Sequence, residues 1–184
     1  MSFVDEIKDF AHKRAVELKA ISKAELTLDA VQVAVAGQSL EFRVDVERRA
    51  AWNLYIELAT RITARPLAPE HGRLRDALSS IHAIFAIVRE TLKQAGPAVA
   101  RGPMSLGGFS LRLLDEQLAP FLAEWHPRLE DWECKRPEQV GPSEHERAWP
   151  EQAALRDQLE LRRQAVAGYI EALAILAGLD ESES

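Results

Sequence analysis

Apolar residues recur at steps of three and four along most of this chain, the spacing that places side chains on one face of an α-helix. The clearest run lies in residues 71–94 and has the a/d pattern of a packed bundle helix. Its apolar positions are Leu74, Leu78, Ile81, Phe85, Val88 and Leu92. Similar runs predict helices over residues 2–20 and 45–64, from Ser105 to Trp132, and from Ser143 to Gly178. The pattern predicts a mainly α fold, a bundle of about five helices in one domain over residues 1–184.

The second predicted helix has a wide apolar face. Its main stripe is Trp52, Ile56, Ala59 and Ile62. Leu54 and Leu58 widen this stripe. Glu57 and Arg61 are four residues apart, so they are expected to pair along the helix surface.

Residues 30–45 have a different period. Val31, Val33 and Val35 alternate with polar or small residues, as do Leu40, Phe42 and Val44, and a four-residue turn with Gly37 separates the two runs. This alternation predicts a small β-hairpin between the first and second helices. Two strands alone are marginal in water, so the hairpin must lie on the helices or pair with another chain.

Prolines and caps predict where the later helices bend or begin. Pro120 and Pro127 fall within the apolar pattern of the fourth helix and predict two or three helical pieces. Ser143 and Glu146 have capping-box spacing, which predicts the start of the last helix. Residues 179–184 form a short acidic tail.

Composition narrows the class of protein. The chain is 47% hydrophobic and 28% charged, with a formal net charge of −6 and one cysteine, Cys134. The negative charge and the lack of a long basic run disfavour nucleic-acid binding. No apolar run approaches the roughly 18 to 20 residues of a membrane span, and the N-terminus has acids where a signal peptide would be basic. These features predict a cytoplasmic protein with no intramolecular disulfide.

Histidines, acids and the cysteine offer one candidate metal site. His126, Cys134 and His145 are residue types that suit zinc, but their spacing matches no compact zinc motif. His145-Glu146 begins like HExxH, but Trp149 occupies the position of the second histidine. A metal-dependent reading would use His126, Glu130, Glu133 and His145.

Other catalytic patterns are weaker. The adjacent acids Asp115–Glu116 and Asp131–Glu133 point in different directions on a helix, which is typical of solvated faces. Ser80 and His82 do not share a helix face, and no acid is evident to orient His82 as a base. Gly107-Gly108 lacks a phosphate-loop frame. These patterns predict a protein that is not an enzyme and needs no cofactor or metal.

A cluster of tryptophan, histidine and acids lies at the end of the fourth helix, in residues 118–133. Arg162 takes a seam position of the last helix, where a charge tends to set partner choice or register. Tryptophan and arginine are enriched at binding hot spots. The predicted partner-binding residues are Trp125, His126, Glu130, Trp132, Glu133 and Arg162.

Three segments carry a resemblance to a known group of proteins: AWNLYIELATRI, LRDALSSIHAIFAIVRETLKQAGP and LAPFLAEWHPRLEDWE. With the Trp52-Leu54-Tyr55-Glu57-Leu58 and Trp125-His126-Pro127 signatures, residues 51–178 resemble small bacterial helical proteins associated with multi-gene conflict, or anti-phage, systems. The resemblance implies an accessory component of a defence locus. It implies no catalytic residues.

Two functional hypotheses follow. The first is a non-enzymatic accessory or regulatory subunit that binds another protein encoded nearby, or a second copy of the chain. The alternative is a metal-dependent hydrolase, or a helical domain that senses a metal or a small ligand in a pocket near Trp52 and Trp125.

Overall fold

The computed structural model describes residues 2–25, 46–61, 65 and 72–179, without the side chains of residues 21–25. Within these ranges the protein is mainly helical, as predicted, and contains no strand. The predicted hairpin, residues 30–45, lies outside the described residues. None of the described helices is long and apolar enough to cross a membrane.

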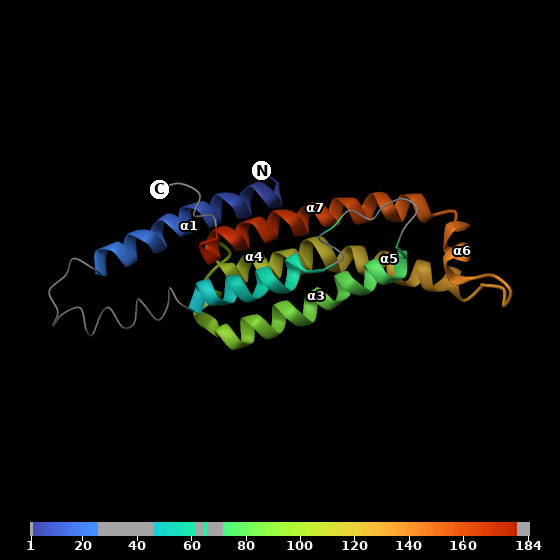
Figure 1. Cartoon of the computed structure of the whole chain (residues 1–184), viewed down its shortest axis with the longest axis horizontal. Helices are drawn as coiled ribbons and strands as arrows, with labels where there is room; N and C mark the ends of the chain where they lie inside the picture. The colour runs from blue at the N-terminus through green and yellow to red at the C-terminus, as the bar shows by residue number, and fades with distance from the viewer. Residues whose placement is uncertain (1, 26–45, 62–64, 66–71, 180–184) are drawn as a thin grey trace.

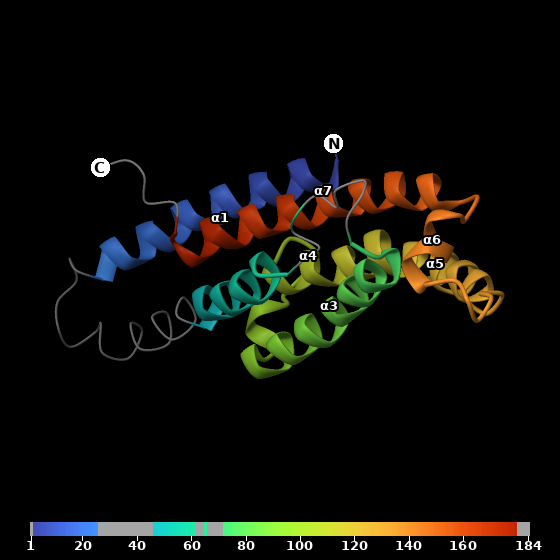
Figure 2. The same cartoon turned by 45° about the vertical axis from the view of Figure 1, so that its right-hand side comes forward.

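Two long helices, one from each end of the described chain, pack extensively against each other. α1 (Phe3–Glu25) and α7 (Gln152–Ala177) lie side by side and run in the same direction (Figures 1 and 2). Lys8 and Glu171 form an ion pair between them. The two helices approach closely at Gly168, where a Cβ would collide with the side chain of Val4.

A second layer packs beneath this pair (Figure 2). It contains the teal helix over residues 46–59 (called helix 46–59 below), α3 (Leu74–Ala95), and the consecutive helices that begin with α4 (Leu106–Arg112). A short 3-10 helix, Pro97–Val99, follows α3. α3 ends where the sequence predicts, before Gly96, whose φ of 74° is readily adopted by glycine.

The core confirms most of the predicted apolar stripes. Leu74, Leu78, Ile81 and Val88 of α3 are buried, while Phe85 and Leu92 pack at the edge of the core. In α7, within the helix predicted from Ser143 to Gly178, the buried residues include Leu155, Leu159, Val166, Leu173 and Leu176. α7 ends at Gly178 in the left-handed conformation, as predicted.

Pro120 and Pro127 affect the fourth predicted helix in different ways. α4 continues into the π-helix η3 (Leu113–Leu118), which is followed by α5 (Ala119–Glu133) with Pro120 in its first turn. The amide of Ala119 bonds to the carbonyl of Leu114, five residues back, so the wider turn accommodates the proline. Pro127 lies inside α5 and does not end it. The prediction of several helical pieces is therefore confirmed at Pro120 and wrong at Pro127.

The predicted last helix is two helices. α6 (Pro142–Arg147) begins after Gly141, with Pro142 in its first turn and no side-chain cap, so the predicted Ser143–Glu146 capping box is wrong. The chain turns at Trp149-Pro150 before α7 begins. Glu146 does cap a helix, but a different one. Its Oε1 accepts a hydrogen bond of 2.8 Å from the amide of Leu74, the first residue of α3.

Candidate functional site

Trp125 belongs to the core. It is only 5% exposed, and its ring meets the edge of Trp149 at 6.1 Å between centroids. The Arg128 guanidinium lies 4.8 Å from the centre of the Trp125 ring and covers it. Trp125, one of the predicted partner-binding residues, is therefore packed against other side chains of this chain.

Contacts between Trp132 and His145 join the end of α5 to α6. Their rings stack at 4.5 Å with an angle of 8°. Trp132 Nε1 donates to the His145 carbonyl at 2.9 Å, and His145 Nε2 donates to the Trp132 carbonyl at 2.8 Å. These two hydrogen bonds and the ring contact make His145 a structural link between α5 and α6.

Glu133 and His126 share one arginine, Arg75 of α3. Arg75 donates from Nη2 and Nε to Glu133 Oε2 at 2.6 and 3.0 Å, a fork that ties α3 to α5. Its Nη1 donates to His126 Nδ1 at 3.1 Å. Arginine can only donate, so Nδ1 accepts and the neutral His126 carries its proton on Nε2, a buried atom with no hydrogen-bond partner among the described residues.

The pKa of His126 lies below its ordinary value. Burial is the largest cause, and the positive charges of Arg75 and His82 act in the same direction. Glu130 and Glu133 raise the pKa by smaller amounts. The fold therefore favours neutral His126, and its contribution to stability is present above the unfolded-state pKa of about 6.5 and is lost as the pH falls below it.

Replacing His126 with glutamine is expected to reduce the acid sensitivity of the fold. The glutamine carbonyl can still accept from Arg75 but cannot be protonated in this range. Urea denaturation at pH 7 and pH 5.5 measures the effect. The wild-type protein should lose more of its free energy of unfolding between these pH values than His126→Gln does, and equal losses would contradict the burial of a neutral imidazole.

The predicted metal ligands are not assembled. Glu130 and Cys134 lie on the surface, Glu133 is bound by Arg75, and His145 faces Trp132. Across the described ranges, no three His, Cys, Asp or Glu side chains lie together as ligands of one ion.

Arg162 has one hydrogen-bond partner across the helix seam and one on its own helix, α7. Its Nη1 donates to Gln117 of η3 at 3.4 Å and its Nη2 to Gln158 at 3.3 Å, with the Phe121 ring 5.8 Å from the guanidinium carbon. Both hydrogen-bond partners of this seam charge are side-chain amides rather than acids. The predicted pair Glu57–Arg61 also forms, at 3.9 Å.

Helix 46–59 buries a different face from the one its main apolar stripe indicates. Its fully buried side chains are Ala51, Leu54 and Leu58. Trp52 is 44% exposed and Ile56 is 41% exposed. The prediction of the main stripe is therefore corrected, because the residues thought only to widen it form the core face.

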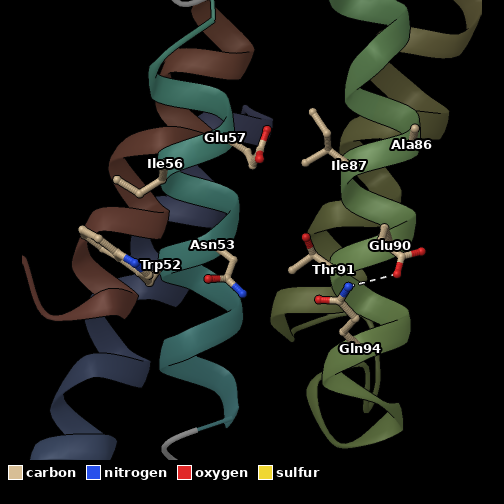
Figure 3. A pocket seen from close by; sticks show the side chains of 9 residues that line it. All are labelled: Trp52, Asn53, Ile56, Glu57, Ala86, Ile87, Glu90, Thr91 and Gln94. Atoms are coloured by element: carbon tan, nitrogen blue, oxygen red, sulfur yellow. Dashed lines mark hydrogen bonds between the residues drawn. The ribbon is translucent and has the colours of Figure 1, made fainter.

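Trp52 and Ile56 line a cleft of about 480 Å³ between helix 46–59 and α3, called the Trp52 cleft below (Figure 3). Its lining residues are Trp52, Asn53, Ile56, Glu57, Ala86, Ile87, Glu90, Thr91 and Gln94. The apolar members lie on both walls, and the polar members include two carboxylates. The Trp52 ring also stacks on Tyr55, with 6.0 Å between centroids. The Tyr55 ring therefore packs against one face of the exposed indole.

A second cleft of about 340 Å³ opens beside α1 and residues 98–105. Three of its charged residues, Arg14, Glu17 and Glu47, pair with one another. Arg14 donates to Glu47 at 2.8 and 3.1 Å and to Glu17 at 2.8 Å, and the bond to Glu47 is the main reason that the pKa of Arg14 is raised. The Trp52 cleft has the larger exposed apolar surface and is the stronger candidate binding site.

The sequence missed the Trp52 cleft because its second wall comes from another helix. A usable signal was present, however, since helix 46–59 has two apolar stripes and a bundle helix of this kind needs to bury only one. No known family model, no curated protein and no solved structure matches this chain, so its own geometry carries the functional argument.

Proposed function

We propose that this chain is a non-enzymatic interaction subunit that binds another protein through the Trp52 cleft. The observation that carries the proposal is the uncovered pair Trp52 and Ile56, two large apolar side chains on adjacent helix turns that are each more than 40% exposed. A contiguous apolar surface with a polar rim is typical of interaction sites. Tryptophan is among the residues most enriched at binding hot spots.

The roles of the other candidate residues support a non-catalytic reading. His145 and Trp132 satisfy each other, and Arg75 holds both Glu133 and His126. Catalytic acids and bases need a cleft in which they can reach a substrate, whereas these groups link α3, α5 and α6. They are therefore assigned to the stability of that end of the bundle.

The biological context that we propose comes from the resemblance of residues 51–178 to bacterial conflict-system proteins. We place the protein in the bacterial cytoplasm as an accessory component of a multi-gene defence locus, with its partner encoded nearby. A second copy of the chain is the other candidate partner, and self-association would show on a sizing column without any added protein.

Co-elution with the products of neighbouring genes tests this function. The wild-type chain should co-elute with one of them, and Trp52→Ala with Ile56→Ala should abolish the complex, because truncating a tryptophan hot spot costs about 2 kcal/mol or more, roughly a 30-fold loss of affinity. Leu161→Ala is the matched control. Leu161 is 51% exposed on α7, outside the cleft, and its loss should leave the complex intact.

Two results would overturn the proposal. The first is that no neighbouring product co-elutes and the chain does not self-associate. The second is that the doubly substituted chain binds its partner as tightly as the wild type. Circular dichroism and urea denaturation of each variant establish that a lost complex does not reflect a lost fold.

A further inference from the structure

We infer that the Trp52 cleft receives an amphipathic α-helix whose apolar face is flanked by lysine or arginine. This inference rests on the proposed function and specifies the chemistry of the partner at the same site. It follows from three properties of the cleft: the shape of its walls, its apolar anchors and its charge.

The walls of the cleft suit a helix. Each wall is a helix face, with Trp52 and Ile56 one turn apart on one side and Ile87 and Thr91 one turn apart on the other. In Figure 3 residue numbers rise in opposite directions along the two walls, so the helices are antiparallel. A third helix laid along this gap would continue the packing of ridges into grooves that builds a bundle.

An extended strand fits these walls less well. Peptides that bind as strands gain affinity from main-chain hydrogen bonds to an open sheet edge. Both walls here are helical, and main-chain groups within a helix are already paired with one another. The wall of α3 from Ala86 to Gln94 is about 12 Å long, from its rise per residue, and so matches about two turns of a docked helix.

The apolar residues of the cleft provide a surface against which such a helix can bury its apolar face. The apolar lining residues include Trp52 and Ile56 on helix 46–59 and Ile87 on α3. In Figure 3 Ile87 points toward the gap between the two helices, and Trp52 and Ile56 lie on the outer side of their helix. Leucine, isoleucine or methionine side chains at steps of three and four on the incoming helix would meet these residues. The cleft therefore selects an amphipathic helix.

The charge of the cleft determines which residues should flank the apolar face of the docked helix. Glu57 and Glu90 are the charged residues of the lining, which includes no lysine or arginine. Glu57 lies 3.9 Å from Arg61, at the outer limit of an ion pair, and Glu90 accepts a 2.9 Å hydrogen bond from the neutral amide of Gln94. A basic side chain beside the apolar face would pair with these carboxylates, whereas an acidic one would be repelled. The face of Trp52 adds a further site for a cation.

Three designed peptides test the inference on the full-length chain. Each has about 20 residues, long enough to be helical in isolation, and the same leucine-and-alanine apolar face. Their flanking positions are lysine, glutamine or glutamate. Fluorescence anisotropy of a labelled peptide measures affinity. The lysine peptide should bind roughly tenfold more tightly than the glutamine peptide, and its advantage should shrink as salt is added.

Variants of the chain assign this preference to the cleft. Glu57→Gln with Glu90→Gln should remove the tenfold advantage and leave the affinity of the glutamine peptide unchanged. Asp115→Asn with Glu116→Gln is the matched control, because these exposed acids lie on η3 outside the cleft. The control should keep the advantage, which excludes attraction to the overall negative charge of the chain. Trp52→Ala should weaken all peptides that bind.

The outcomes separate this inference from the function on which it rests. If the glutamine or glutamate peptide binds at least as tightly as the lysine peptide, the basic partner is wrong while Trp52-dependent docking stands. If the control variant loses the advantage as fully as the cleft variant, the charge assignment is also wrong. If no peptide binds, the helical occupant is wrong, and the co-elution experiment with its Trp52 variant still decides the proposed function by itself.

Discussion

Replacing Phe109 with alanine is expected to lower the free energy of unfolding by about 4 kcal/mol, the largest effect of any change considered for this protein. Phe109 of α4 is fully buried, and its ring lies 5.0 Å from that of Phe10 and 6.3 Å from that of Phe3. The Arg112 guanidinium is 5.5 Å from the same ring. Truncation would leave a cavity where α1 meets α4, and it would remove two aromatic contacts and one cation–π contact.

Urea denaturation followed by circular dichroism measures the effect of Phe109→Ala. Leu111→Ala provides the comparison, since Leu111 lies two residues later in α4 and is 47% exposed. Its substitution should change the free energy of unfolding by less than about 0.5 kcal/mol. Similar losses in the two variants would contradict the placement of Phe109 at the junction of the two helices.

Replacing Glu146 with alanine is expected to cost about 2 kcal/mol, because it leaves the buried amide of Leu74 without its acceptor. A carboxylate at the start of α3 also interacts favourably with the helix dipole. Glu146→Gln keeps an oxygen acceptor in the same place and should recover most of the lost stability. Hydrogen exchange at the Leu74 amide should become faster in the alanine variant and change much less in the glutamine variant.

Glu144→Ala is the matched control for this cap. Glu144 is an exposed acid on the same short helix, and its loss should leave both the unfolding curve and the Leu74 amide unchanged within error. If Glu146→Ala is as stable as Glu144→Ala, the cap from α6 does not stabilise α3.

The periodicity of the sequence was enough to predict most of the helical fold. Leu74, Leu78, Ile81 and Val88 are buried as their spacing predicts, and Gly96 and Gly178 end α3 and α7 as their lack of a side chain predicts. Both signals act within one or two helix turns. They do not depend on which other segment covers the helix, and for that reason they can be read from the sequence.

Features that depend on a second segment could not be read in this way. Periodicity shows that helix 46–59 has two apolar stripes, but only the packed bundle shows that Leu54 and Leu58 are covered while Trp52 and Ile56 are not. The capping prediction for Glu146 failed for the same reason. A capping box is a local pattern, and the competing acceptor role at Leu74 is 72 residues away in the sequence.

The predicted binding site shows the same difference between local features and features that depend on a second segment. Trp125 and His126 belong to a helix, as predicted, but they lie in the middle of α5. Sequence could not reveal that Trp149 and Arg128 pack against Trp125 or that Arg75 binds His126. Arg75 gave no signal of its own because a single arginine on a helix is usually solvated. The Trp52 cleft likewise needs Ile87 and Glu90 from a helix that begins more than 20 residues after Trp52.

The parallel pairing of α1 with α7 constrains when this part of the protein can fold. α1 precedes the other described helices in the sequence, and α7, with which it packs extensively, follows them. Contacts of such large sequence separation form only after a long loop has been closed, which slows folding. The face of α1 that meets Gly168 can be covered by α7 only after more than 120 residues between the two helices have been synthesised, so this apolar face is exposed in shorter nascent chains.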